Sequence, residues 1–232
     1  MRYGKIVPGI FHSRPNRFIA MVEPEGEPLQ KVHVKNTGRC KELLVPGCTV
    51  YLEEGSNPDR KTKYSLVAVE KGDLLINMDS QAPNKAAGEW LAAHPLPQIG
   101  KLPVKIKPEY TFGKSRLDFC LEYDDGSRAL VEVKGVTLEQ DGLLLFPDAP
   151  TQRGVKHLRE LAAAVDDTTH CCVLFVAQMK QVHTFAPNRA THPEFADALA
   201  QAAKAGVQVL CYDCVVTPKS MELDAPVRVE LR

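Results

Sequence analysis

The chain has 232 residues, of which 44% are hydrophobic and 25% are charged, and its 29 basic residues balance its 29 acidic ones. This composition is typical of a soluble globular protein of one or two domains and excludes a chain that is disordered or coiled coil throughout. No apolar run approaches the ~18 residues of a membrane-spanning helix, and no apolar signal-peptide core follows the first five residues. We therefore expect a cytoplasmic protein with no membrane partner, whose seven cysteines stay reduced.

Residues 1–79 have the pattern of a small β-barrel. Short apolar runs are separated by turn residues such as Pro15-Asn16 and Gly55–Asp59. The five predicted strands are Lys5–His12, Arg17–Glu23, Pro28–Lys35, Thr49–Glu53 and Tyr64–Val69. A five-stranded oligonucleotide-binding (OB) barrel fits this pattern, and an SH3-like barrel would look almost the same.

Residues 80–232 alternate between helices and strands, which predicts a second domain of the α+β or α/β class with a sheet flanked by helices. The predicted helices are Asn84–Ala92, capped by Asn84, then Thr151–Val165 and Pro193–Ala205. The predicted strands are Pro103–Thr111, Arg116–Tyr123, Arg128–Val133, Cys171–Ala177 and Val207–Val216. Gln181–Pro193 is expected to be a loop.

The charges of the chain are unevenly distributed. Eight basic residues stand against three acidic ones in residues 1–41, and five stand against one in residues 99–117. Two basic patches on a neutral chain are compatible with nucleic-acid binding, although a solvated surface explains them equally well.

Three ionisable side chains are expected to meet on two adjacent strands. Because strand side chains alternate between faces, Glu132 and Lys134 project from one face, ~7 Å apart. The turn at Asp125-Gly126 folds the preceding strand back, so Asp118 lies beside Glu132 if the register allows. Two carboxylates and one ammonium suit Mg²⁺- or Mn²⁺-dependent hydrolysis of a phosphodiester. A surface salt bridge across the strands is the simpler alternative.

The helix that starts near Thr151 is predicted to be amphipathic, at ~100° per residue. Its apolar stripe consists of Val155, Leu158, Ala162 and Val165. Its polar stripe consists of Arg153, Lys156, His157 and Glu160. The polar stripe suits phosphate groups near a metal site, and a solvated helix face is the alternative explanation.

Five motifs, in order along nearly the whole chain, resemble the sugar fermentation stimulation protein (SfsA) family. They are Asn36-Thr37-Gly38-Arg39, Leu43-Leu44-Val45-Pro46-Gly47, Ser115–Phe119, Val131–Thr137 and Phe146–Leu158. The resemblance implies an N-terminal OB-like barrel and a C-terminal domain like the PD-(D/E)xK nucleases. It also implies a nucleic-acid partner, for which DNA is the expected form.

The resemblance assigns a role to particular residues. Asp118 and Glu132 are similar to the metal-binding carboxylates of the nuclease motif, and Lys134 to its catalytic lysine. Glu89, on the preceding helix, is the candidate third metal ligand, or else a solvent-facing helix residue. The predicted phosphate-binding residues are Arg153, Lys156, His157, Arg116, Arg39 and Lys41.

Two other functions remain open. One is a catalytically inactive DNA-binding regulator of sugar (maltose) metabolism, and the other is a binder of a small phosphorylated metabolite. The intact Asp118, Glu132 and Lys134 count against a decayed site, and a steep salt dependence would favour DNA over a small ligand. Both a monomer and a homodimer are compatible with the sequence. Cys211 and Cys214 resemble half of a zinc site, but no second Cys-x₂-Cys pair is present.

Overall fold

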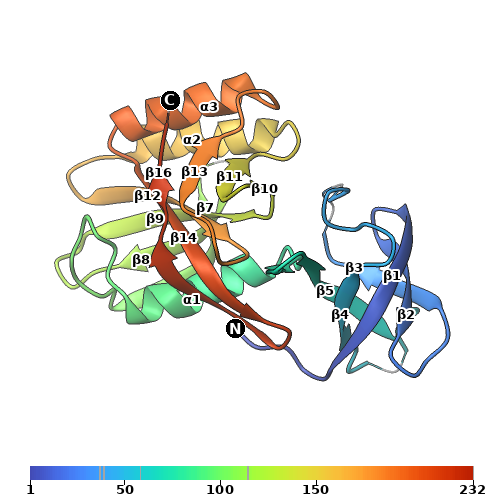
Figure 1. The fold of residues 1–232 in the computed structure, drawn as a ribbon. Helices are drawn as coiled ribbons and strands as arrows, with labels where there is room; N and C mark the ends of the chain where they lie inside the picture. The colour runs from blue at the N-terminus through green and yellow to red at the C-terminus, as the bar shows by residue number, and fades with distance from the viewer. Residues whose placement is uncertain (37, 39, 58, 114, 232) are drawn as a thin grey trace.

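The computed structural model describes residues 1–36, 38, 40–57, 59–113 and 115–231. They form a β-barrel and a larger α/β domain that lie side by side (Figure 1). The first residues of the chain, before β1, lie against the larger domain, where Tyr3 N donates a hydrogen bond to Lys219 O. The chain therefore passes between the two domains twice, once before the barrel and once after it.

The N-terminal domain contains six strands, and buried and exposed side chains alternate in several of them. They are β1 (Ile6–Asn16), β2 (Ile19–Pro24), β3 (Gln30–Val34), β4 (Thr49–Glu54), β5 (Tyr64–Lys71) and β6 (Leu74–Asn77). In β2, for example, Ala20 and Val22 are buried, whereas Glu23 is exposed. Burial of a valine or leucine side chain contributes about 1.5–3 kcal/mol to folding.

Pairing of β3 with β5 closes the barrel. The strand order is β3-β2-β1-β4-β5-β6, and the parallel pairs His33↔Ser65 and Val34↔Leu66 join its first strand to its fifth. The prediction of a five-stranded OB-like barrel is thereby confirmed. The additional strand β6 was not predicted, because it is only four residues long and follows a tight turn at Gly72, whose φ is 58°.

The larger domain contains a six-stranded mixed sheet in the order β15-β14-β12-β9-β8-β7. Its strands are β7 (Lys105–Phe112), β8 (Ser115–Glu122), β9 (Arg128–Val136), β12 (Thr169–Ala177), β14 (Gln208–Thr217) and β15 (Ser220–Pro226). β9, β12 and β14 are parallel, and antiparallel strands flank them on both sides. The predicted mixed sheet is confirmed, and β15 extends it.

Helices cover both faces of this sheet (Figure 1). α2 (Gln152–Ala164) and α3 (Pro193–Lys204) pack on one face, and α1 (Ala82–Ala93) packs on the other. Successive side chains of β9 point to opposite faces of the sheet, since Leu130 packs on the side of α2 and Val131 on the side of α1. The same alternation separates Cys211 from Cys214, and all seven cysteines are free thiols.

The start of α1 and the expected loop at 181–193 differ from the prediction. α1 begins at Ala82 with Pro83 in its first turn, so Asn84 lies inside the helix and does not cap it. The expected loop contains β13 (Thr184–Pro187), which belongs to a second sheet with β10 (Glu139–Gln140), β11 (Leu143–Phe146) and β16 (Arg228–Val229). These strands have two to four residues each, too few to show a clear period in the sequence.

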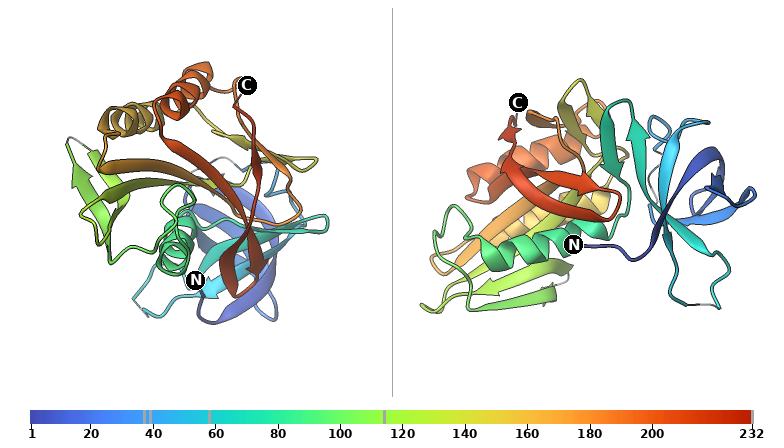
Figure 2. Two further views of the ribbon diagram at one scale, coloured as in Figure 1. Left: turned by 90° about the vertical axis from the view of Figure 1, so that its left-hand side faces the viewer. Right: turned by 60° about the horizontal axis from the view of Figure 1, so that its bottom comes forward.

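Buried hydrogen bonds fasten the barrel to the larger domain. Gln178, after β12, donates through Nε2 to Asn77 O at 3.0 Å and to Asp79 O at 3.2 Å. Lys71 of the barrel lies 2.7 Å from the buried carboxylate of Glu139. The first turn of α1 consequently lies on the side of the larger domain that faces the barrel (Figure 2). No helix within the described ranges is long and apolar enough to cross a membrane.

Candidate nuclease-like active site

Asp118 interrupts the ladder between β8 and β9. The last regular pair is Phe119↔Val131, and the same register places Asp118 opposite Glu132. At this point Val133 N donates to the side chain of Asp118, with 2.7 Å between the nitrogen and Oδ2. A side chain therefore replaces the carbonyl that would continue the ladder, and the strand pair opens around a carboxylate.

Asn84 of α1 holds the other oxygen of the same carboxylate. Its Nδ2 donates to Asp118 Oδ1 at 2.6 Å. The sequence pattern does not reveal this role, because it assigns Asn84 to a helix cap. Pro83 offered a signal, since proline is favoured in the first turn of a helix and its position would have moved the predicted start earlier.

Glu132 lies in the centre of the candidate site and is only 3% exposed. Its Oε1 accepts hydrogen bonds from Lys134 Nζ and from His157 Nδ1, each at 2.5 Å. Its Oε2 is buried and has no hydrogen-bond partner within the described residues. The predicted convergence of Asp118, Glu132 and Lys134 is present, with one carboxylate oxygen unsatisfied.

The two carboxylates have opposite pKa shifts. Burial raises the pKa of Asp118, and the neighbouring charge of Glu132 raises it further against the opposing hydrogen bond from Val133 N. Burial would also raise the pKa of Glu132, but the hydrogen bond from His157 and the charge of Lys134 outweigh it and lower the pKa. Glu132 is therefore the carboxylate held in its charged form.

His157 lies on the buried side of α2, contrary to the prediction that it belongs to an exposed polar stripe. The buried side of the helix consists of Gly154, Val155, His157, Leu158, Leu161 and Ala164. His157 is 3% exposed and contacts Glu132, so it does not contact solvent as a phosphate ligand would. Arg153 Nε approaches the other ring nitrogen, Nε2, at 3.5 Å, which matches a ring whose Nδ1 carries the hydrogen towards Glu132.

The other predicted phosphate ligands are dispersed. Lys156 is exposed on α2, 3.7 Å from Glu160, and Arg116 forms an exposed ion pair with Glu109 at 2.7 Å. Lys41 lies on the barrel. Arg39 falls outside the described residues. Besides His157 itself, Arg153 is the predicted phosphate ligand whose described hydrogen bond reaches the cluster around Glu132.

Glu89 is not part of the Asp118 cluster in the described structure. It lies five residues after Asn84 on α1, about 140° around the helix, and its Oε2 is 2.5 Å from the amino group of Met1. The predicted third metal ligand therefore contacts a different partner. Within the described residues, no group of three or more His, Cys, Asp or Glu side chains is arranged to hold a metal ion.

The remaining donor set still fits a hard divalent cation. Mg²⁺ is commonly bound by one or two carboxylates, with water and phosphate oxygens completing its shell. Asp118 and Glu132 supply two carboxylates, and the unsatisfied Oε2 of Glu132 is the kind of buried oxygen that such a cation would satisfy. The fit rests on two protein carboxylates and not on the three that were expected.

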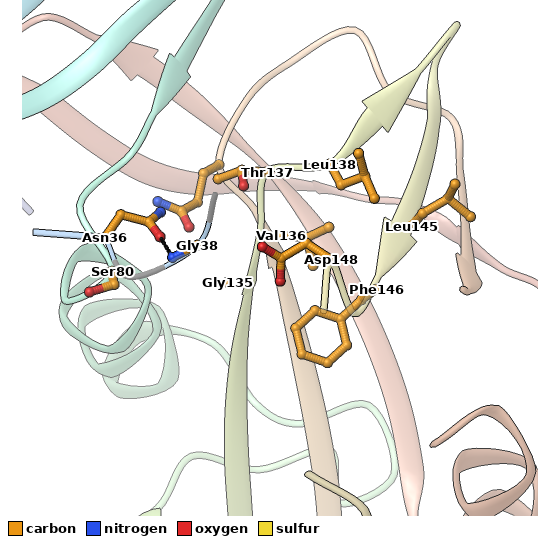
Figure 3. A pocket seen from close by; sticks show the side chains of 11 residues that line it. Asn36, Gly38, Ser80, Gly135, Val136, Thr137, Leu138, Leu145, Phe146 and Asp148 are labelled. Carbon is orange, nitrogen blue, oxygen red and sulfur yellow. Dashed lines mark hydrogen bonds between the residues drawn. The ribbon is translucent and has the colours of Figure 1, made fainter. Parts of the chain in front are cut away.

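Two hollows lie near this site, one between the domains and one on the barrel. The junction pocket lies between the domains and is lined on its two sides by residues such as Asn36 and Gly135 (Figure 3). The barrel groove is lined by Arg14, Asn16, Arg17, Gly38, Cys40, Lys41 and Leu44. Gly38 lines both hollows, so a cationic surface of the barrel continues into the junction between the domains.

The OB-like barrel and the larger domain with its buried carboxylate pair define a class of two-domain protein, and comparison with known proteins agrees with that class. Residues 13–78 match the family model described as the SfsA N-terminal OB domain, and residues 81–220 match the sugar fermentation stimulation protein RE domain. The chain belongs to the sugar fermentation stimulation protein family, so the resemblance found in the sequence is confirmed.

Individual relatives cover nearly the whole chain. A sugar fermentation stimulation protein homolog of Desulfitobacterium hafniense (strain Y51) is 54% identical over 232 residues, which is 100% of this chain and 99% of the relative. A homolog of Clostridium beijerinckii is 49% identical over 223 residues, 96% of each chain. The solved structure of Pyrococcus furiosus SfsA in complex with Ca²⁺ has a TM-score of 0.86 at 27% identity and covers 99% of this chain and 98% of that one.

Proposed function

We propose that the protein binds nucleic acid, with DNA as the expected form, and hydrolyses phosphodiester bonds in a reaction that depends on Mg²⁺ or Mn²⁺. The observation that carries the proposal is the pair of carboxylates, Asp118 and Glu132, with Lys134 on the same buried cluster. We assign residues 1–79 to a nucleic-acid-binding barrel and residues 80–232 to the catalytic domain. The seven free thiols, six of them buried, support a cytoplasmic location.

Asp118 and Glu132 would hold the metal ion. The relative from Pyrococcus furiosus was solved in complex with Ca²⁺, and Ca²⁺ shares the preference of Mg²⁺ for oxygen ligands. A bound divalent ion would supply a water of lowered pKa and would neutralise charge on the phosphate. Asn84 and the backbone N–H of Val133 fix the orientation of Asp118, while His157 fixes that of Glu132.

Lys134 would stabilise charge during the reaction. Its ammonium donates one hydrogen bond to Glu132 and has two more N–H donors for a phosphate oxygen or for the attacking water. Arg153, anchored beside His157, is the nearest of the predicted cations of α2 that could contact an adjacent phosphate. Lys156 and Arg116 would contact more distant phosphates from their exposed positions.

The barrel groove would bind the nucleic acid. Arg17 and Lys41 supply exposed positive charge, and the next residue after Arg17 is Phe18, which is 56% exposed. Exposed aromatic rings beside cations are the usual means by which OB barrels stack the bases of single strands. The groove meets the junction pocket at Gly38, so a strand bound there would be directed towards β9.

A cleavage assay tests this function. The wild type, the Asp118→Asn variant and the control Asp197→Asn, which alters a surface carboxylate of α3, are incubated with single-stranded, double-stranded and branched DNA and with RNA. We expect one of these substrates to be cut by the wild type and the control, only with Mg²⁺ or Mn²⁺, and not by Asp118→Asn. Metal and DNA binding without cleavage of any substrate would instead make the protein a DNA-binding module.

A further inference from the structure

The junction pocket has the size and lining of a site for one small planar ligand. Its volume is about 180 Å³, below the ~300–1,000 Å³ of pockets for drug-sized molecules. The wall from the larger domain is largely apolar and includes Val136, Leu145 and Phe146 (Figure 3). The opposite wall comes from the segment around Asn36 and Gly38 and from Ser80.

The polar atoms that the pocket leaves unsatisfied are mainly hydrogen-bond acceptors. Gln178 is 2% exposed, and its Nε2 donates to Asn77 and Asp79, but its Oε1 accepts no hydrogen bond from any described residue. The carboxylate of Asp148 likewise has no described hydrogen bond or ion pair, and Figure 3 shows it turned into the space between Gly38 and Phe146. A ligand with N–H donors on a flat ring would satisfy both.

The glycine at position 38 keeps this space open. A Cβ atom placed on Gly38 would lie 2.8 Å from Asp148 Oδ2 and 2.9 Å from Asn36 Oδ1. Both distances are shorter than real Cβ contacts, so a side chain at position 38 would push the carboxylate of Asp148 or the amide of Asn36 out of its present place. Glycine therefore allows the Asp148 carboxylate to lie close to the barrel backbone.

From this lining we infer that the junction pocket binds a single unstacked guanine base. Guanine presents two adjacent donors, N1–H and the N2 amino group, which one carboxylate such as Asp148 can accept together. Adenine and cytosine place an acceptor beside their amino group, and thymine and uracil flank their N–H with carbonyls that would face Asp148. Phe146 offers an aromatic surface for the ring, as in other pockets for extruded bases.

The position of the pocket connects this inference to the proposed function, on which its biological meaning rests. Gly135 lines the pocket, and the preceding residue, Lys134, belongs to the carboxylate cluster. Gly38 joins the pocket to the barrel groove. A nucleotide strand bound along the groove would thus place one base in the pocket and a neighbouring phosphate near Asp118 and Glu132.

Calorimetry with the full-length protein and the four mononucleotides dGMP, dAMP, dCMP and dTMP tests the inference. We expect dGMP to bind most tightly at millimolar or lower concentration. Asp148→Asn should weaken dGMP binding about tenfold, the usual effect of losing a bidentate base contact. Gly38→Ala should also weaken dGMP binding, because its methyl group would displace the carboxylate of Asp148. The control Asp73→Asn changes an exposed carboxylate in the turn between β5 and β6 and should have no effect.

Equal binding of the four nucleotides, no binding of dGMP, or unchanged dGMP binding by Asp148→Asn would each overturn the inference. The thermal midpoint of Asp148→Asn shows whether the variant is folded, and because Asp148 is exposed we expect it to match the wild type. If dGMP binds as expected while no nucleic acid is cut, the guanine site is supported and the proposed hydrolysis is contradicted. Cleavage without selective dGMP binding would instead support the hydrolysis and remove the guanine site.

Discussion

His157 Nδ1 lies 2.5 Å from Glu132 Oε1, and each of the two side chains is only 4% exposed. The contact joins α2 to β9 across the face of the sheet. It fixes one oxygen of Glu132 and leaves the other, Oε2, without a partner within the described residues. This relationship makes His157 a positioning residue for the candidate metal site.

Replacing His157 with alanine should therefore weaken metal binding. Loss of an outer-shell partner typically lowers metal affinity about 10–100-fold. The buried carboxylate would keep the hydrogen bond from Lys134 but lose the one from His157, which should reduce stability by about 1–3 kcal/mol. Titration calorimetry with Mn²⁺ and urea unfolding measure the two effects. Arg159→Ala, on the exposed side of the same helix, is the control. Unchanged Mn²⁺ affinity in a folded His157→Ala variant would show that the contact has only a structural role.

Replacing Asn84 with alanine should act on the other carboxylate. Asp118 would lose the donor to Oδ1 but keep the hydrogen bond from Val133 N, so its position should loosen without collapse of the strand pair. We expect metal affinity and any cleavage rate to fall by about tenfold. Lys85→Ala, the exposed neighbour on α1, should behave as the wild type. If the two variants had the same metal affinity and cleavage rate, Asn84 would have no role in positioning Asp118.

Binding of single-stranded DNA should depend on the barrel groove. Phe18→Ala should weaken it about tenfold, since stacking of one base on an aromatic ring contributes about 1–3 kcal/mol. Arg17→Ala and Lys41→Ala should each lower the slope of log affinity against log salt by about one. Fluorescence anisotropy measures both effects. Leu29→Ala alters another exposed apolar residue of the barrel and should change neither the DNA affinity nor its salt dependence. If Leu29→Ala weakened DNA binding as much as Phe18→Ala, the assignment of the groove would be contradicted.

The ion pair between Lys71 and Glu139 should make stability depend on pH. Burial raises the pKa of Glu139, but the hydrogen bond from Gly142 N and the contact with Lys71 outweigh it, so the folded carboxyl has a lowered pKa. Such a group stabilises the fold above its unfolded pKa of ~4.3 and loses that contribution as the pH falls through the folded value. Glu139→Gln should therefore be less stable than the wild type at pH 7, and the difference should shrink below about pH 4. A difference that stays constant from pH 7 to pH 3 would refute this assignment.

Local patterns in the sequence predicted much of the fold. Alternation along β9 separated Glu132 and Lys134 from Val131 and Val133, and the turn at Asp125-Gly126 brought β8 back beside it in the register that places Asp118 opposite Glu132. α2 also begins where the sequence predicted a helix, and Thr151 caps it, since its hydroxyl accepts a hydrogen bond from Gly154 N at 3.1 Å. These features depend on neighbours within one hairpin or one helical turn.

The errors involve contacts between distant segments. The contact of Asn84 with Asp118 and that of Glu89 with Met1 depend on how α1 packs, which no local pattern reveals. His157 is a different case, because it lies three residues after Gly154 and four before Leu161, the spacing of a buried helix face. A wider apolar stripe would have included it. The junction pocket combines segments from both domains and could not be read from either alone.

Every catalytic proposal above depends on a divalent cation held by Asp118 and Glu132, and calorimetric titration with Mn²⁺ measures that binding. The titration compares the wild type with the double variant Asp118→Asn, Glu132→Gln, whose side chains keep the size of the originals. We predict saturable binding to the wild type and none to the double variant, with both proteins folded by circular dichroism. Equal binding to the two proteins, or no binding to a folded wild type that still binds DNA, would contradict the assignment of the metal site.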